Sequence, residues 1–205
     1  KLWLNKGWID YYTPQLYWKI NQTAQSFPVL LGWWAGENTK HRHLWPGMNV
    51  DYGGDEKNSD EVINQIMITR GMLPDSKGAV HWSIGPLIKH PDLSKALVEG
   101  PYKNQALVPS SPWLDSDIPS VPVVASQTVS NKLNVTWQHE NAQDIFRWVV
   151  YYKYNNGPWL YKIVSKNDRS IELSKIQEGR NASISHIAVT AVNRSGNESD
   201  QCLHS

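Results

Sequence analysis

The chain has 205 residues, of which 40% are hydrophobic and 19% charged, as in a folded globular protein of one domain or two small ones. A formal net charge of +1, with no run of Lys or Arg longer than a pair, excludes the basic footprint typical of nucleic-acid binding. No apolar run approaches the roughly 18–20 residues that span a bilayer, so no transmembrane segment is expected.

The aromatic residues and the single cysteine give further information on possible functions and on disulfide formation. Eleven Trp and nine Tyr stand against only two Phe. Trp and Tyr combine a flat apolar face with a polar group, so they suit stacking on sugar rings as well as burial, and burial is the favoured interpretation for any one Trp. Cys202 is the only cysteine, so no disulfide can form within the chain and the redox compartment is left open.

Residues 1–100 are predicted to alternate strands with helices. The predicted strands are residues 7–18, 43–52 and 78–88. The predicted helices are residues 27–36, 58–71 and 90–100, with Pro28 and Pro91 in first turns and Asn58 and Glu61 as a capping box. Three successive strand–helix units predict a parallel sheet with right-handed crossovers, whose ligands bind beyond the carboxyl ends of the strands.

The remaining residues change character. Residues 101–118 are rich in Pro, Ser and Asp without periodicity, which indicates a linker packed along the first domain. Residues 119–205 contain short alternating runs separated by turns, with Trp137 facing inward, which predicts a small β-sandwich resembling a fibronectin type III domain. We therefore expect an α/β domain over residues 1–118 and an all-β domain over residues 119–205.

No motif for a cofactor or a metal is present. The segment "YGGDEK" lacks the glycine spacing of a nucleotide-binding loop and is interpreted as a turn. The pair in "HRH", His41 and His43, has no third ligand at usable spacing for zinc, and no Ser lies in a nucleophile elbow. No cofactor is expected.

Carboxylates remain as candidates for chemistry. Asp51 follows the second predicted strand, and Asp55 and Glu56 lie in the loop after it. Paired carboxylates at the carboxyl end of a parallel sheet serve acid–base chemistry, so Asp51 is the candidate catalytic residue. A solvated loop is the alternative for all three, and it is favoured for Asp55 and Glu56.

Four blocks of the sequence carry a family resemblance. They are "GWIDYYTPQLYW", "LWPGMN", "GAVHWSIGPLI" and "LVPSSPWLD", and they resemble the closing section of the glycosyl-hydrolase-like 10 family. Its members resemble family 10 glycoside hydrolases: a (β/α)₈ TIM-type barrel, often followed by a fibronectin-type module, in bacterial envelope and secreted proteins. The resemblance implies that the three predicted strands correspond to the last three of eight.

The resemblance also implies a function and a site. It implies hydrolysis of glycosidic bonds in a polysaccharide or in peptidoglycan glycan strands, with a glycan as partner and a periplasmic, outer-membrane-anchored or secreted location. The positions that would face substrate are Gln15, Tyr17, Trp18, Asn49, Trp82 and Ser83.

The sequence departs from the family in one important respect. The Asp-rich segment of a middle barrel strand is missing, so the main catalytic acids are expected upstream of residue 1, and the chain alone is expected to be inactive. Its open strand edge is expected to associate with itself or with the missing part of the barrel. The alternative is a non-catalytic glycan-binding or scaffold module of the cell envelope, which a count of carboxylates at all strand ends would distinguish.

Overall fold

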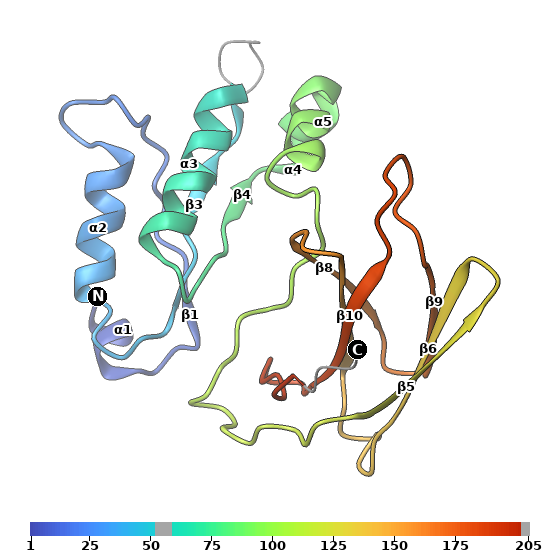
Figure 1. Ribbon diagram of the computed structural model, residues 1–205. Helices are drawn as coiled ribbons and strands as arrows, with labels where there is room; N and C mark the ends of the chain where they lie inside the picture. Colours follow the sequence, from blue (N-terminus) through green and yellow to red (C-terminus); the bar gives the residue numbers. More distant parts are fainter. Residues whose placement is uncertain (52–58, 202–205) are drawn as a thin grey trace. The chain divides into compact units, whose positions relative to one another are not determined.

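The computed structural model describes residues 1–51 and 59–201, and the chain folds as two compact units, Lys1–Asn104 and Gln105–Ser205 (Figure 1). The boundary predicted from sequence, between residues 118 and 119, differs from this division. Residues 105–118 form part of the second unit. The sequence pattern instead predicts a linker over residues 101–118 that packs along the first domain.

Helices and short strands alternate in the first unit. The helices are α1 (Leu2–Lys6), α2 (Phe27–Glu37), α3 (Ser59–Met72), α4 (Ile84–Lys89) and α5 (Pro91–Glu99). The strands are β1 (Tyr11–Tyr12), β2 (His43–Leu44), β3 (Gly47–Asn49) and β4 (Val80–Trp82). This order agrees with the predicted succession of strand–helix units.

The strands of the first unit pair in parallel and in chain order. β1 pairs with β2, and β3 pairs with β4. A parallel bridge from Gln15 to Gly47 continues the first pairing beyond β2, and the Gly47 N–H donates to the Pro14 carbonyl at 2.8 Å. On the other side, the Val80 N–H donates to the Pro46 carbonyl at 3.0 Å. The predicted parallel arrangement of three strands is observed, although three strands do not show an eight-stranded barrel.

Two predicted strands are longer than the observed ones. Gly7 has φ 69° and caps α1, a helix that the prediction missed, so the chain enters the first strand only afterwards. The third strand ends at Trp82 instead of residue 88, because α4 begins at Ile84. Pro86 lies in the first turn of α4, where a helix does not need the missing N–H of proline.

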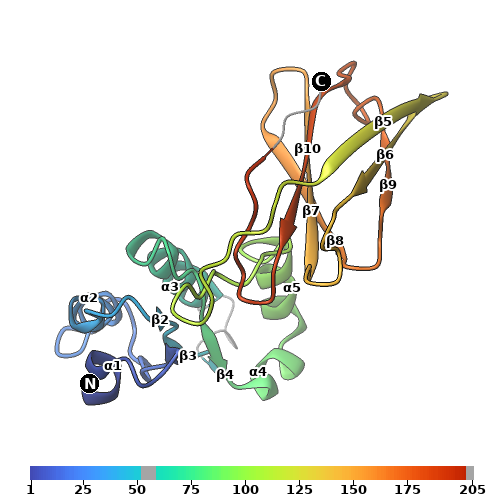
Figure 2. The ribbon, with the colours of Figure 1, turned by 90° about the horizontal axis from the view of Figure 1, so that it is seen from below.

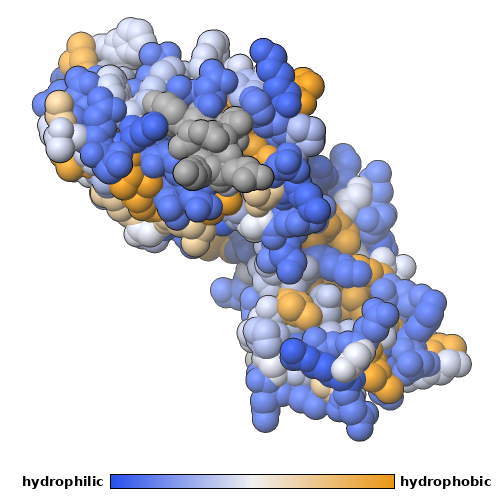
Figure 3. Space-filling model, turned by 90° about the horizontal axis from the view of Figure 1, so that it is seen from above, coloured by the Kyte–Doolittle hydropathy of each residue, from blue (hydrophilic) through white to orange (hydrophobic). Residues whose placement is uncertain are grey.

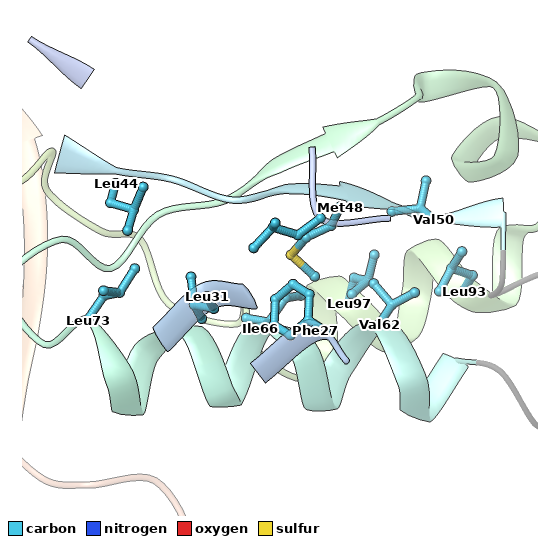
Figure 4. Close-up of a cluster of buried hydrophobic side chains, with 11 residues drawn as sticks. Phe27, Leu31, Leu44, Met48, Val50, Val62, Ile66, Leu73, Leu93 and Leu97 are labelled. Carbon is cyan, nitrogen blue, oxygen red and sulfur yellow. The ribbon is translucent and has the colours of Figure 1, made fainter. Parts of the chain in front are cut away.

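One face of the parallel strands packs against α2, α3 and α5 (Figure 2). Leu44 on β2 and Met48 on β3 are fully buried and point towards the helices (Figure 4). Val50, which follows β3, is fully buried in the same cluster. The buried helix residues of this core are Phe27, Leu31, Val62, Ile66, Leu93 and Leu97. Because side chains alternate along a strand, the residues between the buried ones face the opposite side of the sheet.

The two neighbouring tryptophans of α2, Trp33 and Trp34, differ in environment. Trp34 packs on the core and its ring lies 4.7 Å from that of Tyr12. Trp33 is about half exposed, with the Lys1 ammonium 5.6 Å from its ring centroid. Trp34 therefore contributes to the core, whereas Trp33 lies at the surface.

The second unit is a sandwich of two antiparallel sheets. The strand orders are β5-β6-β9 and β10-β7-β8. The strands are β5 (Val123–Val129), β6 (Lys132–Gln138), β7 (Arg147–Tyr154), β8 (Trp159–Ser165), β9 (Ser170–Ser174) and β10 (Ile184–Val192). The antiparallel pairing predicted for this region is observed.

The core of the sandwich contains a pair of tryptophans from the two sheets. Trp137 on β6 is 1% exposed, as predicted, and its ring lies 6.2 Å from that of Trp148 on β7. Alternate residues of β6 are buried, the pattern expected of a strand with one face on the core. β5 was not predicted, because nearly all its residues are exposed and it has no hydrophobic alternation.

Hydrogen bonds explain why the predicted linker joins the second unit. The Asn193 side-chain amide donates to Asp115 Oδ2 and to the Asp117 carbonyl, both at 3.0 Å. The Asn197 side-chain amide donates to the Asp115 carbonyl at 2.8 Å. The turn after β10 therefore holds residues 115–117 by their backbone and a side chain.

The surface has no extended apolar region on the face seen in Figure 3, where hydrophobic residues form separate patches among hydrophilic ones. Isolated exposed hydrophobic residues are normal for a folded protein. Within residues 1–51 and 59–201, no helix has the length and apolar character needed to cross a membrane.

Candidate functional site

The carboxyl ends of the parallel strands bring three predicted site residues to one face of the sheet. Asn49 lies opposite Trp82 in the β3–β4 register, and Gln15 lies opposite Gly47 in the preceding pairing. Residues opposite each other in a sheet project to the same side. Met48 points into the core formed with α2, α3 and α5, so Asn49 and its neighbours face the opposite side of the sheet.

This sheet face is open at Trp82. The indole is 63% exposed, and Gln15 is exposed as well. Ser83, which follows Trp82 across a cis peptide bond, is the N-cap residue of α4 but makes no side-chain capping hydrogen bond. A flat exposed ring beside amide side chains can stack on a sugar ring while the amides bind its hydroxyl groups.

Asn49 forms one local hydrogen bond through its side chain. Its Oδ1 accepts a hydrogen bond of 2.9 Å from the Asp51 N–H, a local bond that Asn commonly makes to the backbone two residues on. Its Nδ2 group has no hydrogen-bond partner within residues 1–51 and 59–201. Asn49 can therefore hold the start of the loop and donate to a ligand at the same time.

Tyr17 and Trp18 lie on a segment that α3 anchors. Gln65, fully buried on α3, donates from Nε2 to the Trp18 carbonyl at 3.0 Å. Glu61, one turn earlier, accepts the Ile20 N–H at 2.7 Å and a second hydrogen bond from Gln65 Nε2 at 2.8 Å. Both aromatic side chains are partly exposed, so neither is enclosed in the core.

The carboxylates do not form a catalytic pair in the described residues. Asp51 is exposed. Glu61, predicted only as part of a capping box, holds the Ile20 backbone instead, and its predicted partner Asn58 lies outside the described residues. Asp55 and Glu56 also lie outside them. Asp51 therefore remains a prediction as a catalytic residue.

Sequence reasoning missed an aromatic row on the same sheet face. The Tyr11 and Trp45 rings are stacked at 5.1 Å, and the His43 and Trp45 rings are stacked at the same distance. Tyr11 pairs with His43 in register, which places both on the side of the sheet opposite the helix-packed core. The alternation of His43 and Trp45 with the buried Leu44 was the sequence pattern that could have predicted this row.

Metal-binding groups do not cluster in the part of the chain that the structure describes. Within residues 1–51 and 59–201, no three His, Cys, Asp or Glu side chains lie close enough together to hold a metal ion. His43 instead lies buried against Trp45. The described residues of the site can form hydrogen bonds and aromatic stacking contacts with a ligand.

Comparison with known proteins identifies one curated relative. The chain is 34% identical over 141 residues to the glycosyl hydrolase YngK of Bacillus subtilis, and the similarity covers 65% of this chain. It covers 27% of YngK, so the chain spans about a quarter of the length of that protein. No protein-family model matches the sequence.

Solved structures show weaker similarities. The FN1–FN3 domains of chicken CNTN1 cover 42% of this chain, with 30% of that structure covered, at 22% identity and a TM-score of 0.34. The Clostridium perfringens spore cortex lytic enzyme SleM covers 86% of this chain, with 74% of that structure covered, at 15% identity and a TM-score of 0.35. At these scores the strand pairing itself, and not the similarity, is the basis for describing the second unit as a sandwich.

Proposed function

We propose that this chain is part of a hydrolase that cleaves glycosidic bonds, and that it supplies a sugar-binding face to the active site. The observation that carries the proposal is the exposed Trp82 ring beside Asn49 at the carboxyl ends of parallel strands. The 34% identity to a protein named glycosyl hydrolase supports the same reaction class.

Each residue of the face has a role that suits its chemistry. The Trp82 ring would stack on a sugar ring, and Tyr17 and Trp18 would extend the stacking surface. The amide groups of Asn49 and Gln15 would bind sugar hydroxyl groups, with the Ser83 hydroxyl beside Trp82 as a further partner. The residues would then line a single concavity along the strand ends.

The proposed architecture is the last part of a (β/α)₈ barrel of the glycosyl-hydrolase-like 10 type, followed by a fibronectin type III-like module. Ligands of such barrels bind at the carboxyl ends of the strands, where the proposed face lies. Glycoside hydrolysis uses two carboxyl groups, roughly 5–5.5 Å apart for retention and 6.5–9.5 Å apart for inversion. We place at least one of them in a part of the barrel outside these 205 residues, with Asp51 as the candidate within them.

The proposed partners follow from the same architecture. The substrate would be a polysaccharide or a peptidoglycan glycan strand of the bacterial envelope, met in the periplasm, at the outer membrane or outside the cell. β1 and β4 are the outer strands among the described residues of the first unit, and outer strands of this kind would pair with the remaining barrel strands or with a second copy.

A sugar-release assay on polysaccharide and on peptide-free peptidoglycan strands tests the catalytic part of this proposal. We expect the 205-residue chain to stay at background and a longer chain that includes the remaining barrel strands to release sugar. Turnover by the 205-residue chain that Asp51→Asn abolishes would show that the catalytic groups lie within it. Inactivity of the longer chain, together with retained glycan binding, would favour a non-catalytic glycan-binding module.

Light scattering tests the strand-edge part. Self-association of the 205-residue chain that disappears when the remaining barrel strands are added would support edge pairing. A stable monomer in both cases would contradict it, and this result is independent of the activity assay.

A further inference from the structure

A second polar site lies on the other side of the sheet, within the first unit. A cavity of about 320 Å³ is bounded by the C-terminal half of α3, the segment that enters β4, and Tyr102 after α5. His81 on β4 also lines the cavity. The next residue along β4, Trp82, projects from the opposite face of the sheet. The cavity is therefore separated from the proposed sugar-binding face by the thickness of the sheet.

The charges around this cavity are of one sign. Arg70 and Lys77 both line it, and no Asp or Glu does so among the described residues. Neither side chain forms an ion pair within residues 1–51 and 59–201. Two cations without a carboxylate partner leave a local positive charge that an anion would neutralise.

Arg70 is held in place by neutral groups. Its Nη2 donates to the Pro101 carbonyl at 2.6 Å, and its guanidinium carbon lies 5.7 Å from the centroid of the Tyr102 ring. A guanidinium has five N–H donors in a planar fork, so one bond to a carbonyl leaves the others available. Because its position is already fixed, Arg70 would lose little conformational freedom on binding a ligand.

His81 and Tyr102 add a further donor. Their Nε2 and hydroxyl oxygen lie 2.5 Å apart, while Nδ1 of His81 is buried and has no hydrogen-bond partner among residues 1–51 and 59–201. A buried N–H without a partner is more costly than a buried acceptor, so the tautomer protonated at Nε2 is favoured. Nε2–H then donates to the Tyr102 oxygen, and the phenolic proton stays free to donate elsewhere.

Burial keeps both rings in these protonation states. It lowers the pKa of His81, which favours the neutral imidazole. Partial burial also raises the pKa of Tyr102, against the opposing effect of the Arg70 guanidinium, and this favours the protonated phenol. The lining then offers a guanidinium fork, an ammonium group and a phenolic O–H. All three are donors, which is the set that suits an oxyanion with several acceptor oxygens.

We propose that this cavity binds a small oxyanion, a phosphate or carboxylate group, with Arg70 as the bidentate donor and Lys77 and Tyr102 as its partners. The volume exceeds what one inorganic ion needs, so the oxyanion can be carried by a small organic molecule such as an acidic sugar. The site is independent of the proposed sugar-binding face, since it uses other residues on the other side of the sheet.

Calorimetric titration of the 205-residue chain tests this site. Sodium phosphate, sodium sulfate and sodium acetate are titrated separately into chloride buffer of matched ionic strength, which suppresses general attraction to exposed cations. We expect saturable binding at one site for at least one of them. The ratio of the phosphate and acetate affinities then identifies the class of oxyanion.

Variants locate the site. Arg70→Gln is expected to weaken binding about 10-fold or more, and Arg70→Lys nearly as much, because the fork and not the charge alone is required. Lys77→Gln and Tyr102→Phe are expected to weaken it less and serve as the deciding variants if Arg70→Gln does not fold. Lys95→Gln, an exposed cation on α5 outside the cavity lining, is the matched control.

Two results would overturn the proposal. One is the absence of saturable binding for all three anions. The other is binding that Lys77→Gln and Tyr102→Phe leave unchanged, or that Lys95→Gln reduces as much as they do, which indicates general surface attraction. Neither result bears on glycan binding, which is measured at Trp82.

Discussion

Asn49 on β3 lies directly opposite Trp82 on β4, and both side chains project from the sheet face opposite the one that packs against α2, α3 and α5. The pairing fixes an amide beside an indole without any contact between the two side chains being required. A ligand that stacks on the ring would meet the amide at its edge.

Trp82→Ala is expected to remove most of the glycan affinity of the chain. Stacking of a sugar on an exposed ring is lost, while stability changes little because the indole is 63% exposed. Trp3→Ala is the matched control, since Trp3 in α1 is 62% exposed and lies outside the proposed face. Affinity electrophoresis in gels containing polysaccharide would measure the difference, and equal losses for the two variants would refute the assigned face.

Substitutions at Asn49 separate its two roles. Asn49→Asp retains an acceptor for the Asp51 N–H and removes the donors, so stability should be kept while glycan binding weakens about 10-fold. Asn49→Ala should weaken binding similarly and also cost about 0.5–1.5 kcal/mol of unfolding free energy. Urea denaturation and binding assays on the same preparations would check both. Unchanged binding in Asn49→Asp would argue against a donor role.

Gly78→Ala is expected to destabilise the first unit by about 1–3 kcal/mol. A Cβ at this position would lie 2.4 Å from Cδ1 of Trp45, and the stacked row of Tyr11, Trp45 and His43 restricts the movement of that ring. Gly71→Ala in α3 is the control: its Cβ meets nothing within 4 Å, so helix propensity should raise stability by about 0.5–1 kcal/mol. Thermal unfolding followed by circular dichroism would show opposite shifts, and shifts of the same sign would contradict the packing argument.

The stability of the first unit should fall as the pH drops through the range in which free histidine titrates. Burial lowers the pKa of His81 in the folded state, and Arg70, Lys77 and Tyr102 line the same cavity without a carboxylate to favour the imidazolium. Below about pH 6.5 the unfolded chain binds a proton that the folded chain does not, so acid favours unfolding until the folded pKa is also passed. His81→Gln should reduce the slope of stability against pH between about pH 7 and 5. His41→Gln, an exposed histidine, is the control, and equal slopes for His81→Gln and the wild type would contradict the assignment.

Asn193→Ala should release residues 105–118 from the second unit. The substitution removes donors to Asp115 and Asp117 and the acceptor of the Ser195 and Asn197 N–H groups, at a cost of about 1–3 kcal/mol. Hydrogen exchange measured by mass spectrometry should show faster exchange in this segment. Asn131→Ala, in the exposed turn between β5 and β6, should leave it unchanged. Equal protection in both variants would show that other contacts hold the segment.

The sequence predicted the parallel and antiparallel pairings well, because both depend on local periodicity. The alternation along β6 and the succession of strands with capped helices are visible within a dozen residues. Strand lengths were overestimated at Gly7 and Ile84, where a helix end and a helix start interrupt hydrophobic runs.

The site was predicted less completely, because its geometry depends on residues distant in sequence. The hydrogen bond from Gln65 to the Trp18 carbonyl joins residues 47 positions apart, and no local sequence pattern predicts it. The attachment of Asn193 to Asp115 spans 78 positions, so no local pattern could predict that residues 115–117 bind the turn after β10. The cavity at Arg70 was missed for the same reason, since its lining comes from three separate segments.

The attachment of residues 115–117 has a practical consequence for exchanging the second unit between proteins. A cut at residue 119 would remove the carbonyl of Asp117 and both oxygen acceptors of Asp115, and the amides of Asn193 and Asn197 would lose their partners. A portable module should therefore begin at Gln105, where the compact unit itself begins. A module that starts at Gln105 retains the hydrogen bonds between residues 115–117 and the turn after β10, whereas a module that starts at residue 119 would lose them.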